Sequence, residues 1–380
     1  LLLRLCLWET SMKINLSIFN FNMRKFIFKI LTTFTLLLIF LVSVNYWGDG
    51  AKIFHVGYEN KIADIIFNNK NATNISNFDE RILQRELIKK LEIRPDIMVL
   101  GSSRTMLINS TYFKGSKLIN NSVSGASIED FISIFQIYKT RNMLPKQIIL
   151  GIDPWIFNRN NGQESWSTLR NEYYSFINKK TIKKESIINN KLKQLFSLSY
   201  FQSSFRNLPN VISGRDNPIA TDNIYNKSNT KLVDGSLSYN KAYRESFNQN
   251  VESLVRSDLT KDMYAIENFD IISPQIFNEF EDLCQNILSN NIELSFFIVP
   301  YHPMFYQKIE QDYPMVLLTE SIIIKFANEN NIKCYGSFNP MTESFKSQDF
   351  YDGMHAKEST IKKILAAKTH NTEYNALANW

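Results

Sequence analysis

The stretch between Phe26 and Trp47 is almost wholly apolar, and it restricts what the chain can fold into more than any other feature. A helix of about 20 such residues is what a bilayer core roughly 30 Å thick requires. Basic residues stand at its start and aromatic residues suited to a lipid–water interface at its end: Arg24, Lys25, Lys29, Tyr46 and Trp47. We therefore expect residues 26–47 to form a single-pass anchor in the cytoplasmic (inner) membrane. Residues 1–25 would then stay in the cytoplasm, and the remainder would be periplasmic or extracellular.

Two points about this N-terminal region stay open at the level of sequence. A cleaved signal peptide also combines basic and apolar residues, although no small-x-small cleavage site follows the apolar stretch here. The chain does not begin with Met, so Met12 and Met23 are alternative starts of translation.

Composition argues against several classes of function. The net charge of +6 comes from 43 basic and 37 acidic residues, with no basic block interleaved with aromatics, so we do not expect nucleic-acid binding. The three cysteines and four histidines lack metal-ligand spacing, and no motif implies a metal or any other cofactor. Cys284 and Cys334 are either a disulfide in an oxidising compartment or, as we favour, two buried thiols.

Beyond the anchor, the hydrophobic pattern changes twice. Residues 48–94 predict a juxtamembrane helical region, with Asn77 as the cap of one helix. Across residues 95–370 short apolar strands alternate with amphipathic helices, which indicates a mainly parallel sheet with helices on both faces. An interval at about 157–265 breaks this alternation, and we interpret it as a long, partly helical insertion that shapes the substrate site.

The predicted strands are short apolar runs bounded by polar or turn residues: 96–100, 117–120, 147–153, 292–299 and 332–335. The predicted helices start at capping residues or repeat apolar residues every three to four positions: 127–138, 273–287, 315–328 and about 356–365. In parallel sheets the chemistry sits beyond the carboxyl ends of the strands. Side chains directly after these strands are therefore the candidates for a functional site.

A serine and a late Asp-x-x-His motif form the strongest chemical pattern. Ser103 follows the first of these strands in Gly101-Ser102-Ser103-Arg104, and Asp352 stands three residues before His355. A carboxylate can hold an imidazole in one tautomer, and the imidazole can take the proton of a serine hydroxyl. The pattern predicts a hydrolytic triad, although a plain turn at the serine and a surface Asp/His pair are the alternatives for the separate motifs.

Four further residues stand near the expected site, each with a structural alternative. Asp153 either touches substrate or caps the segment after its strand, and Trp155 either stacks on a sugar ring or belongs to the core. Arg104 either grips an anionic polymer or forms an internal ion pair. His302, at the end of the strand 292–299, either contacts substrate or is a loop histidine.

Taken together, these motifs resemble the SGNH/GDSL hydrolase superfamily, and in particular its membrane-anchored cell-envelope branches. The resemblance covers residues 95–370, apart from the insertion. Its first block, Gly-Asp-Ser in most members, corresponds to Gly101-Ser102-Ser103 and makes Ser103 the nucleophile. The second block's glycine corresponds to Gly125, the third block to Gly151-Ile152-Asp153, and the fifth to Asp352 and His355.

The resemblance implies a three-layer, flavodoxin-like α/β fold and an oxyanion hole built from Ser103, Gly125 and the third-block residue. Here Asp153 stands where the family has an Asn that donates a hydrogen bond. A carboxylate donates only when protonated, so either a backbone N–H substitutes or the third donor is absent.

The implied activity is that of a serine esterase or O-acyltransferase, similar to the D-alanyl transfer proteins of teichoic acids and the alginate O-acetylation proteins. Its partners would be a cell-surface polysaccharide or teichoic-type polymer and, for transfer, a polytopic membrane acyltransferase. The alternative is a catalytically silent protein that keeps this fold for binding or assembly in a polysaccharide export or modification system.

Overall fold

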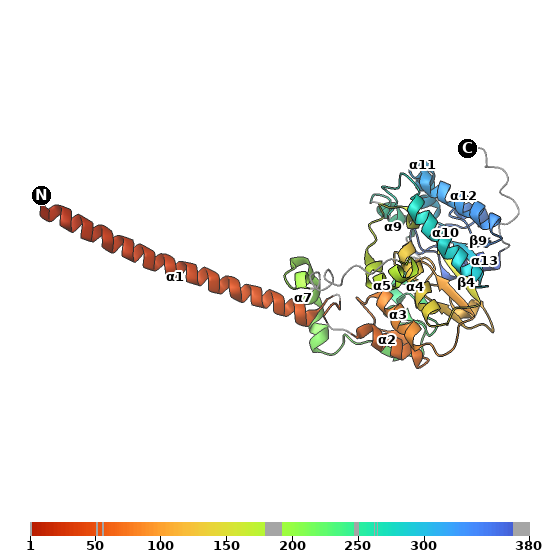
Figure 1. Ribbon diagram of the computed structural model, residues 1–380, viewed down its shortest axis with the longest axis horizontal. Helices are drawn as coiled ribbons and strands as arrows, with labels where there is room; N and C mark the ends of the chain where they lie inside the picture. Colours follow the sequence, from red (N-terminus) through yellow and green to blue (C-terminus); the bar gives the residue numbers. More distant parts are fainter. Residues whose placement is uncertain are drawn as a thin grey trace. The chain divides into compact units, whose positions relative to one another are not determined.

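The chain divides into two units, which are described separately (Figure 1). The first comprises residues 1–56 and 183–216, and the second comprises residues 57–182 and 217–380. The computed structural model describes the following residues, with the backbone alone for residues 2–22: 2–50, 52–54, 57–178, 192–246, 251–261, 263 and 265–367.

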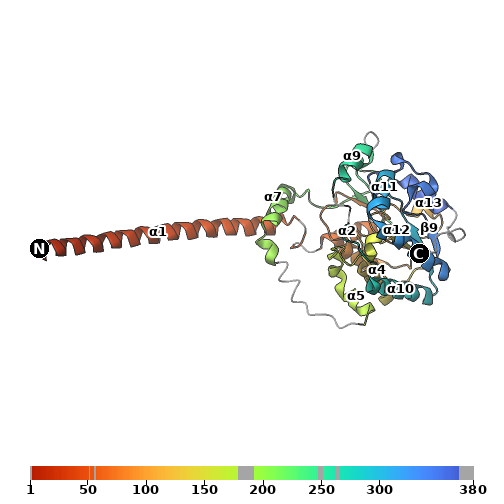
Figure 2. The same cartoon turned by 90° about the horizontal axis from the view of Figure 1, so that it is seen from above.

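Among its described residues, the first unit contains the helices α1 (Leu2–Gly48) and α7 (Leu198–Ile212). Within α1, the 26 residues from Met23 to Gly48 form a helix long and apolar enough to cross a membrane, and few of its side chains are buried. The predicted anchor lies inside this segment. Helix α7 lies beside the C-terminal end of α1 in both views of the chain (Figures 1 and 2).

The second unit contains a five-stranded parallel sheet in the order β3-β2-β4-β8-β9. All five strands were predicted from the sequence, and their bounds differ from the prediction by a residue or two at an end. The strands are β2 (Ile97–Leu100), β3 (Leu118–Asn120), β4 (Gln147–Ile152), β8 (Glu293–Ile298) and β9 (Lys333–Tyr335).

Both faces of the sheet are buried, which explains why its strands read as continuous apolar runs. Along β2, Met98 and Leu100 belong to one core cluster, while Ile97 and Val99 belong to a second one on the opposite face. Helices α4 (Ile128–Thr140), α10 (Pro274–Ser289) and α12 (Pro314–Glu329) pack into the first cluster, and α13 (Glu358–Ala366) packs into the second. The predicted mixed α/β architecture with helices on both faces is therefore present.

Capping explains where several helices begin. Asp130 accepts a hydrogen bond from the Ser127 N–H at the start of α4, and the Ser273 hydroxyl accepts one from the third residue of α10. The prediction for α3 (Glu80–Lys90) was wrong in its cap. Asp79, not Asn77, accepts from the first backbone N–H groups at 2.8 and 3.1 Å, since the carboxylate stands directly before the helix.

A second, antiparallel sheet was not predicted. Its strands are two or three residues long and follow the order β5-β1-β6-β7: β1 (Asn71–Thr73), β5 (Ile219–Thr221), β6 (Thr230–Lys231) and β7 (Leu237–Ser238). Together with α2 (Tyr58–Phe67) and α3, strand β1 forms a small core of its own. Three of these strands come from the interval that the sequence analysis treated as an insertion.

The remaining helices of the second unit are short, and most of them lie in or next to that interval: α5 (Arg170–Phe176), α8 (Lys241–Ser246), α9 (Val251–Asp258) and α11 (Pro303–Asp312). Residues 183–216, also inside the predicted insertion, belong to the first unit instead. Cys284 and Cys334 are free and buried, as two thiols rather than a disulfide.

Candidate functional site

The carboxyl ends of β2, β4 and β8 meet at one edge of the sheet, because neighbouring strands run parallel. Ser103 follows β2 in a tight turn. Gly101 and Gly151 both lie against Thr105 of this turn, and a Cβ at Gly101 would collide with the Thr105 hydroxyl. The two glycines therefore let the turn after β2 pack closely on β4, which fixes the position of Ser103.

Three of the predicted residues meet at hydrogen-bonding distance. Ser103 Oγ lies 2.9 Å from His355 Nε2. On the other side of the ring, His355 Nδ1 lies 2.8 Å from Asp352 Oδ2 and 3.0 Å from Asp352 Oδ1. Since Nδ1 faces a carboxylate, it carries the ring proton, and Nε2 is left to accept from the serine hydroxyl.

Asp352 is held ionised by several donors. Its Oδ1 accepts the backbone N–H groups of Met354 and His355 at 2.7 and 2.8 Å. Burial by itself raises the pKa of this carboxyl, but the electrostatic interaction with His355 and the hydrogen bonds from His355, Tyr243 and Met354 outweigh it. The net result is a pKa below the ordinary value, so the group is a carboxylate at neutral pH.

One residue of this site was missed by the sequence analysis. Tyr243, from α8 in the insertion, donates its hydroxyl to Asp352 Oδ2 at 2.7 Å. Its ring packs at a tilt against the rings of Tyr239 and Tyr351, and the Tyr239 ring meets the His355 ring edge-on at 6.3 Å between centroids. Burial, followed by the nearby Asp352 charge, raises the pKa of Tyr243, so its hydroxyl stays a donor. No local motif connects Tyr243 with a carboxylate 109 residues away.

The two predicted backbone donors are available. In the described part of the chain, neither the Ser103 N–H nor the Gly125 N–H has a hydrogen-bond acceptor. Gly125 has φ +55°, a conformation that glycine adopts without strain, and its residue is partly exposed. Both amides belong to loops that follow adjacent strands, β2 and β3, of the sheet.

The Asp153 side chain is buried and paired with Arg104. Its Oδ1 pairs with Arg104 Nη1 at 2.9 Å, its side chain is 2% exposed, and its Oδ2 has no hydrogen-bond partner among the described residues. Burial raises the pKa of Asp153 from its ordinary value, and the Arg104 guanidinium opposes this only in part. We therefore no longer expect an oxyanion contact from this side chain.

Arg104 is a buried link between three segments rather than a surface cation. Besides Asp153, it donates to the Met354 carbonyl at 3.1 Å and to the Val299 carbonyl, and it stacks over the Tyr301 ring at 4.0 Å. Its side chain is 0% exposed. The structural alternative of an internal ion pair is therefore the one that the structure contains, and direct contact with substrate is not expected.

Trp155 and His302 also lie beneath the surface, not at it. Trp155, in the short turn Pro154–Phe157, donates to the Ala126 carbonyl at 3.1 Å and belongs to the core. His302 accepts the Met304 N–H through Nδ1, and burial lowers its pKa to about 4 despite the nearby charges of Glu252 and Asp352. It is neutral at pH 7, so neither residue is positioned to hold substrate.

A polar cavity of about 460 Å³ adjoins the loop that carries Gly125. Ser124, the residue before Gly125, lines it, together with mainly hydroxyl- and carboxylate-bearing side chains: Asn77, Phe78, Asp79, Glu80, Arg81, Ser165, Ser167 and Thr168. Among the described residues, no three His, Cys, Asp or Glu side chains gather in a group that could hold a metal ion. The site itself brings together a serine hydroxyl, an imidazole and a carboxylate.

Comparison with known proteins adds no relative to this picture. No protein-family model matches the chain, and a search of the curated proteins finds no match.

Proposed function

We propose that this protein is a membrane-anchored serine esterase or O-acyltransferase of the SGNH type. Its substrates would be acyl esters, acetyl or D-alanyl, of a cell-surface polysaccharide or teichoic-type polymer. The observation that carries the proposal is the continuous hydrogen-bonded chain from Ser103 through His355 to Asp352. Numbered by their position in the sequence, the five parallel strands lie side by side in the sheet in the order 2-1-3-4-5, which is the strand order of flavodoxin-like sheets. This order supports the same assignment.

The geometry supports the following course for the first half of the reaction. Ser103 Oγ attacks the ester carbonyl carbon while His355 Nε2 takes the hydroxyl proton, and Asp352 stabilises the resulting imidazolium. The negative charge on the carbonyl oxygen is held by the N–H groups of Ser103 and Gly125. The carbon–oxygen bond to the leaving alcohol then breaks, and the imidazolium gives its proton to that alcohol. An acyl-serine remains.

The second half regenerates the serine. Water or a sugar hydroxyl attacks the acyl-serine and gives its proton to His355, and the Ser103 oxygen leaves and takes that proton back. Water yields a free acid and makes the protein an esterase, whereas a sugar hydroxyl yields a new ester. The cavity beside Ser124, whose lining includes four hydroxyl-bearing side chains, suits a hydroxyl-rich chain. A transferase would receive its acyl group from a polytopic membrane acyltransferase.

The proposed location is the cytoplasmic membrane, with α1 as the single span. The basic residues Arg24 and Lys25 before the apolar segment support a cytoplasmic N-terminus. Helix α7 and the second unit would then be on the periplasmic or extracellular side, where surface polymers are found.

A fluorophosphonate probe tests the enzyme assignment, because it reacts with a serine only when a base activates that serine. The full-length protein is expected to be labelled, and Ser103→Ala and His355→Ala are expected to lose the label. Ser289→Ala, which removes an exposed hydroxyl at the C-terminal end of α10, should be labelled as the parent is. Absence of label on the parent would overturn the proposal and favour a catalytically silent binding protein.

A further inference from the structure

Helix α7 of the first unit carries an apolar stripe that the described part of this unit leaves largely exposed. The stripe repeats at intervals of three and four residues, which places its members on one side of a helix: Leu198, Phe201, Phe205, Leu208 and Ile212. Three of them are strongly exposed, Leu198 at 73%, Phe205 at 54% and Ile212 at 79%. Adjacent large apolar side chains of this kind are unusual on a surface that faces only water.

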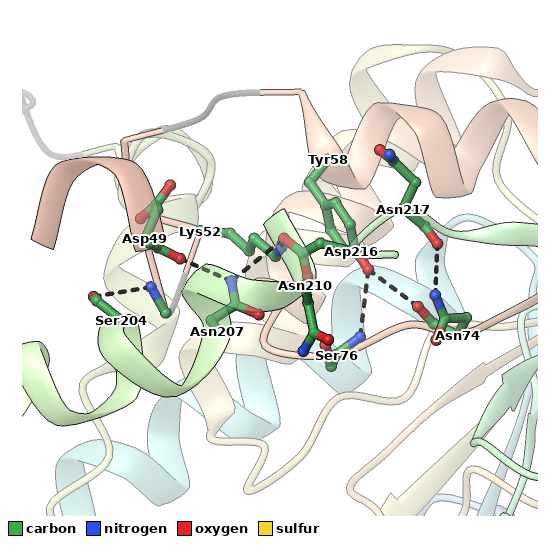
Figure 3. A network of polar contacts seen from close by, with 12 residues as sticks. Asp49, Lys52, Tyr58, Asn74, Ser76, Ser204, Asn207, Asn210, Asp216 and Asn217 are labelled. Atoms are coloured by element: carbon green, nitrogen blue, oxygen red, sulfur yellow. Dashed lines mark hydrogen bonds and ion pairs between the residues drawn. The ribbon is translucent and has the colours of Figure 1, made fainter. Parts of the chain in front are cut away.

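A different face of α7 is fixed against the end of α1 (Figure 3). Tyr200 donates its hydroxyl to Asp49 at 2.6 Å, the Ser204 hydroxyl accepts the Gly50 N–H at 3.1 Å, and Asn207 donates to the Gly48 carbonyl at 2.8 Å. These three residues of α7 are buried. The contacts set how α7 is rotated about its axis, and hence the direction in which the stripe points relative to α1.

The stripe continues the apolar surface of the membrane-spanning segment. The Phe201 ring meets the Phe40 ring edge-on at 5.9 Å and stacks on the Phe205 ring at 5.7 Å. Phe40 lies within the apolar segment Met23–Gly48 and is itself 53% exposed. It precedes Gly48 by eight residues, which is about 12 Å along a helix. Phe201 is therefore next to the part of α1 where a bilayer core would end.

The composition of α7 suits the boundary between lipid and water. The helix contains no acidic residue, and its single charged residue, Arg206, is exposed. Gln202, Arg206 and Asn210, at helical spacing on the side away from the stripe, are exposed as well. Polar and basic residues opposite an apolar face are typical of helices that lie in a membrane interface with that face about 5–10 Å deep.

We propose that α7 is an interfacial membrane helix whose apolar stripe is immersed in the same bilayer that α1 spans. The partner of this surface is phospholipid, and the first unit would hold the membrane in two ways, by a span and by a helix lying flat. This inference rests on α1 spanning a membrane and is independent of the proposed catalytic activity.

Spin labels on neighbouring residues test the proposal in the full-length protein, reconstituted in nanodiscs of phosphatidylcholine and phosphatidylglycerol. The background carries Cys6→Ser, while Cys284 and Cys334 are buried and stay. Labels are placed at Phe205→Cys in the stripe and at Arg206→Cys, one position further around the helix. Dissolved oxygen should increase the relaxation rate of the label at residue 205 several-fold more than a water-soluble nickel complex does. At residue 206 the nickel complex should have the larger effect on the relaxation rate.

A third label, at Leu36→Cys in the middle of the apolar segment of α1, tests whether α1 spans the membrane separately from whether α7 lies in the interface. It is expected to be deeper than the label at residue 205. A deep label at 36 with water-exposed labels at both 205 and 206 would overturn the interfacial helix, and a water-exposed label at 36 would overturn its premise as well. Spin–spin broadening at 205 that disappears on dilution with unlabelled protein would assign the stripe to a second copy, and would also overturn it.

Discussion

Two carboxylates stand near the same edge of the parallel sheet, and their surroundings differ sharply. Asp352 is 23% exposed at its side chain, and both of its oxygens accept hydrogen bonds. Asp153 is 2% exposed, pairs with Arg104 through one oxygen and leaves the other without a partner among the described residues. The pKa is lowered at Asp352 and raised at Asp153. Asp352 is placed to orient His355, the proposed base, and Asp153 holds Arg104 in the interior.

The comparison shows how one site divides reactive and structural roles between similar groups. Asp352 contacts the His355 ring, and this ring contacts the hydroxyl of Ser103, the proposed nucleophile. Asp153 acts one layer below, where Arg104 also binds the carbonyls of Val299 and Met354. A change at Asp352 should therefore reduce the reaction rate, and a change in the Arg104–Asp153 pair should reduce stability first.

The largest expected effect is on the rate of Asp352→Asn. An amide at this position favours the wrong tautomer of His355, and such a change typically costs about ten-thousandfold in rate. Hydrolysis of p-nitrophenyl acetate by the full-length protein measures it. Asp153→Asn is the matched amide substitution, and it should change the rate by less than about tenfold because that side chain is buried on Arg104. Equal losses in the two variants would contradict the division of roles.

The next effect is on the stability of Arg104→Met. Removing one partner of a buried ion pair leaves the other charge uncompensated, which typically costs about 3–5 kcal/mol in the free energy of unfolding. Urea denaturation in detergent measures this loss. Arg85→Met is the control, since Arg85 pairs with Glu172 where both side chains are about a fifth exposed, and it should cost about 1 kcal/mol. Similar losses of unfolding free energy in the two variants would mean that burial does not make the Arg104–Asp153 pair more important for stability than the Arg85–Glu172 pair.

A smaller effect is expected from Tyr243→Phe. The change removes one hydrogen bond to the Asp352 carboxylate and keeps the ring in its stack. We expect kcat to fall about three- to tenfold with KM unchanged, as for the loss of one charge-assisted hydrogen bond. Tyr239→Phe keeps the bond to Asp352 and serves as the control. A loss of thermal stability without any change in kcat would show a role in packing alone.

The smallest effect is a change in how stability depends on pH. Because the pKa of Asp352 is lowered from 3.8, this group contributes stability above about pH 4 that is lost as the pH falls further. Asp352→Asn should therefore flatten the acid limb of the unfolding curve. The pKa of Asp153 is raised, so ionisation of this group lowers the stability of the parent as the pH rises from about 4. Asp153→Asn lacks this ionisation, and its stability relative to the parent should therefore increase over the same range. Urea midpoints between pH 3 and 6 measure both slopes.

Much of the parallel sheet could be predicted because burial on both faces leaves a strong trace in sequence. The apolar run 292–299 contains β8, Glu293–Ile298, and the capping pair of Ser127 and Asp130 marks the start of α4. The antiparallel sheet left no such trace. A strand of two residues such as β6, Thr230–Lys231, shows no alternation, and one of its two partner strands, β1, is far from it in the sequence.

The site divides in the same way. Ser103, Asp352 and His355 were predicted because a turn after a buried strand and an Asp-x-x-His motif are both visible locally. Tyr243 was missed because it approaches Asp352 only in the folded chain. For Arg104 the sequence offered two fates, and only burial against Asp153 decides between them.

The turn that holds Asp352 has a consequence for how activity is lost. The Tyr351 N–H donates to the His355 carbonyl at 2.8 Å, and the Asp352 carboxylate accepts two backbone N–H groups of the same turn. The turn by itself therefore fixes Asp352 relative to His355. Folding then has only to bring this turn to Ser103, which precedes His355 by 252 residues in the sequence. Detachment of the C-terminal segment would silence the protein while the central strands remain paired, so inactivation should precede global melting.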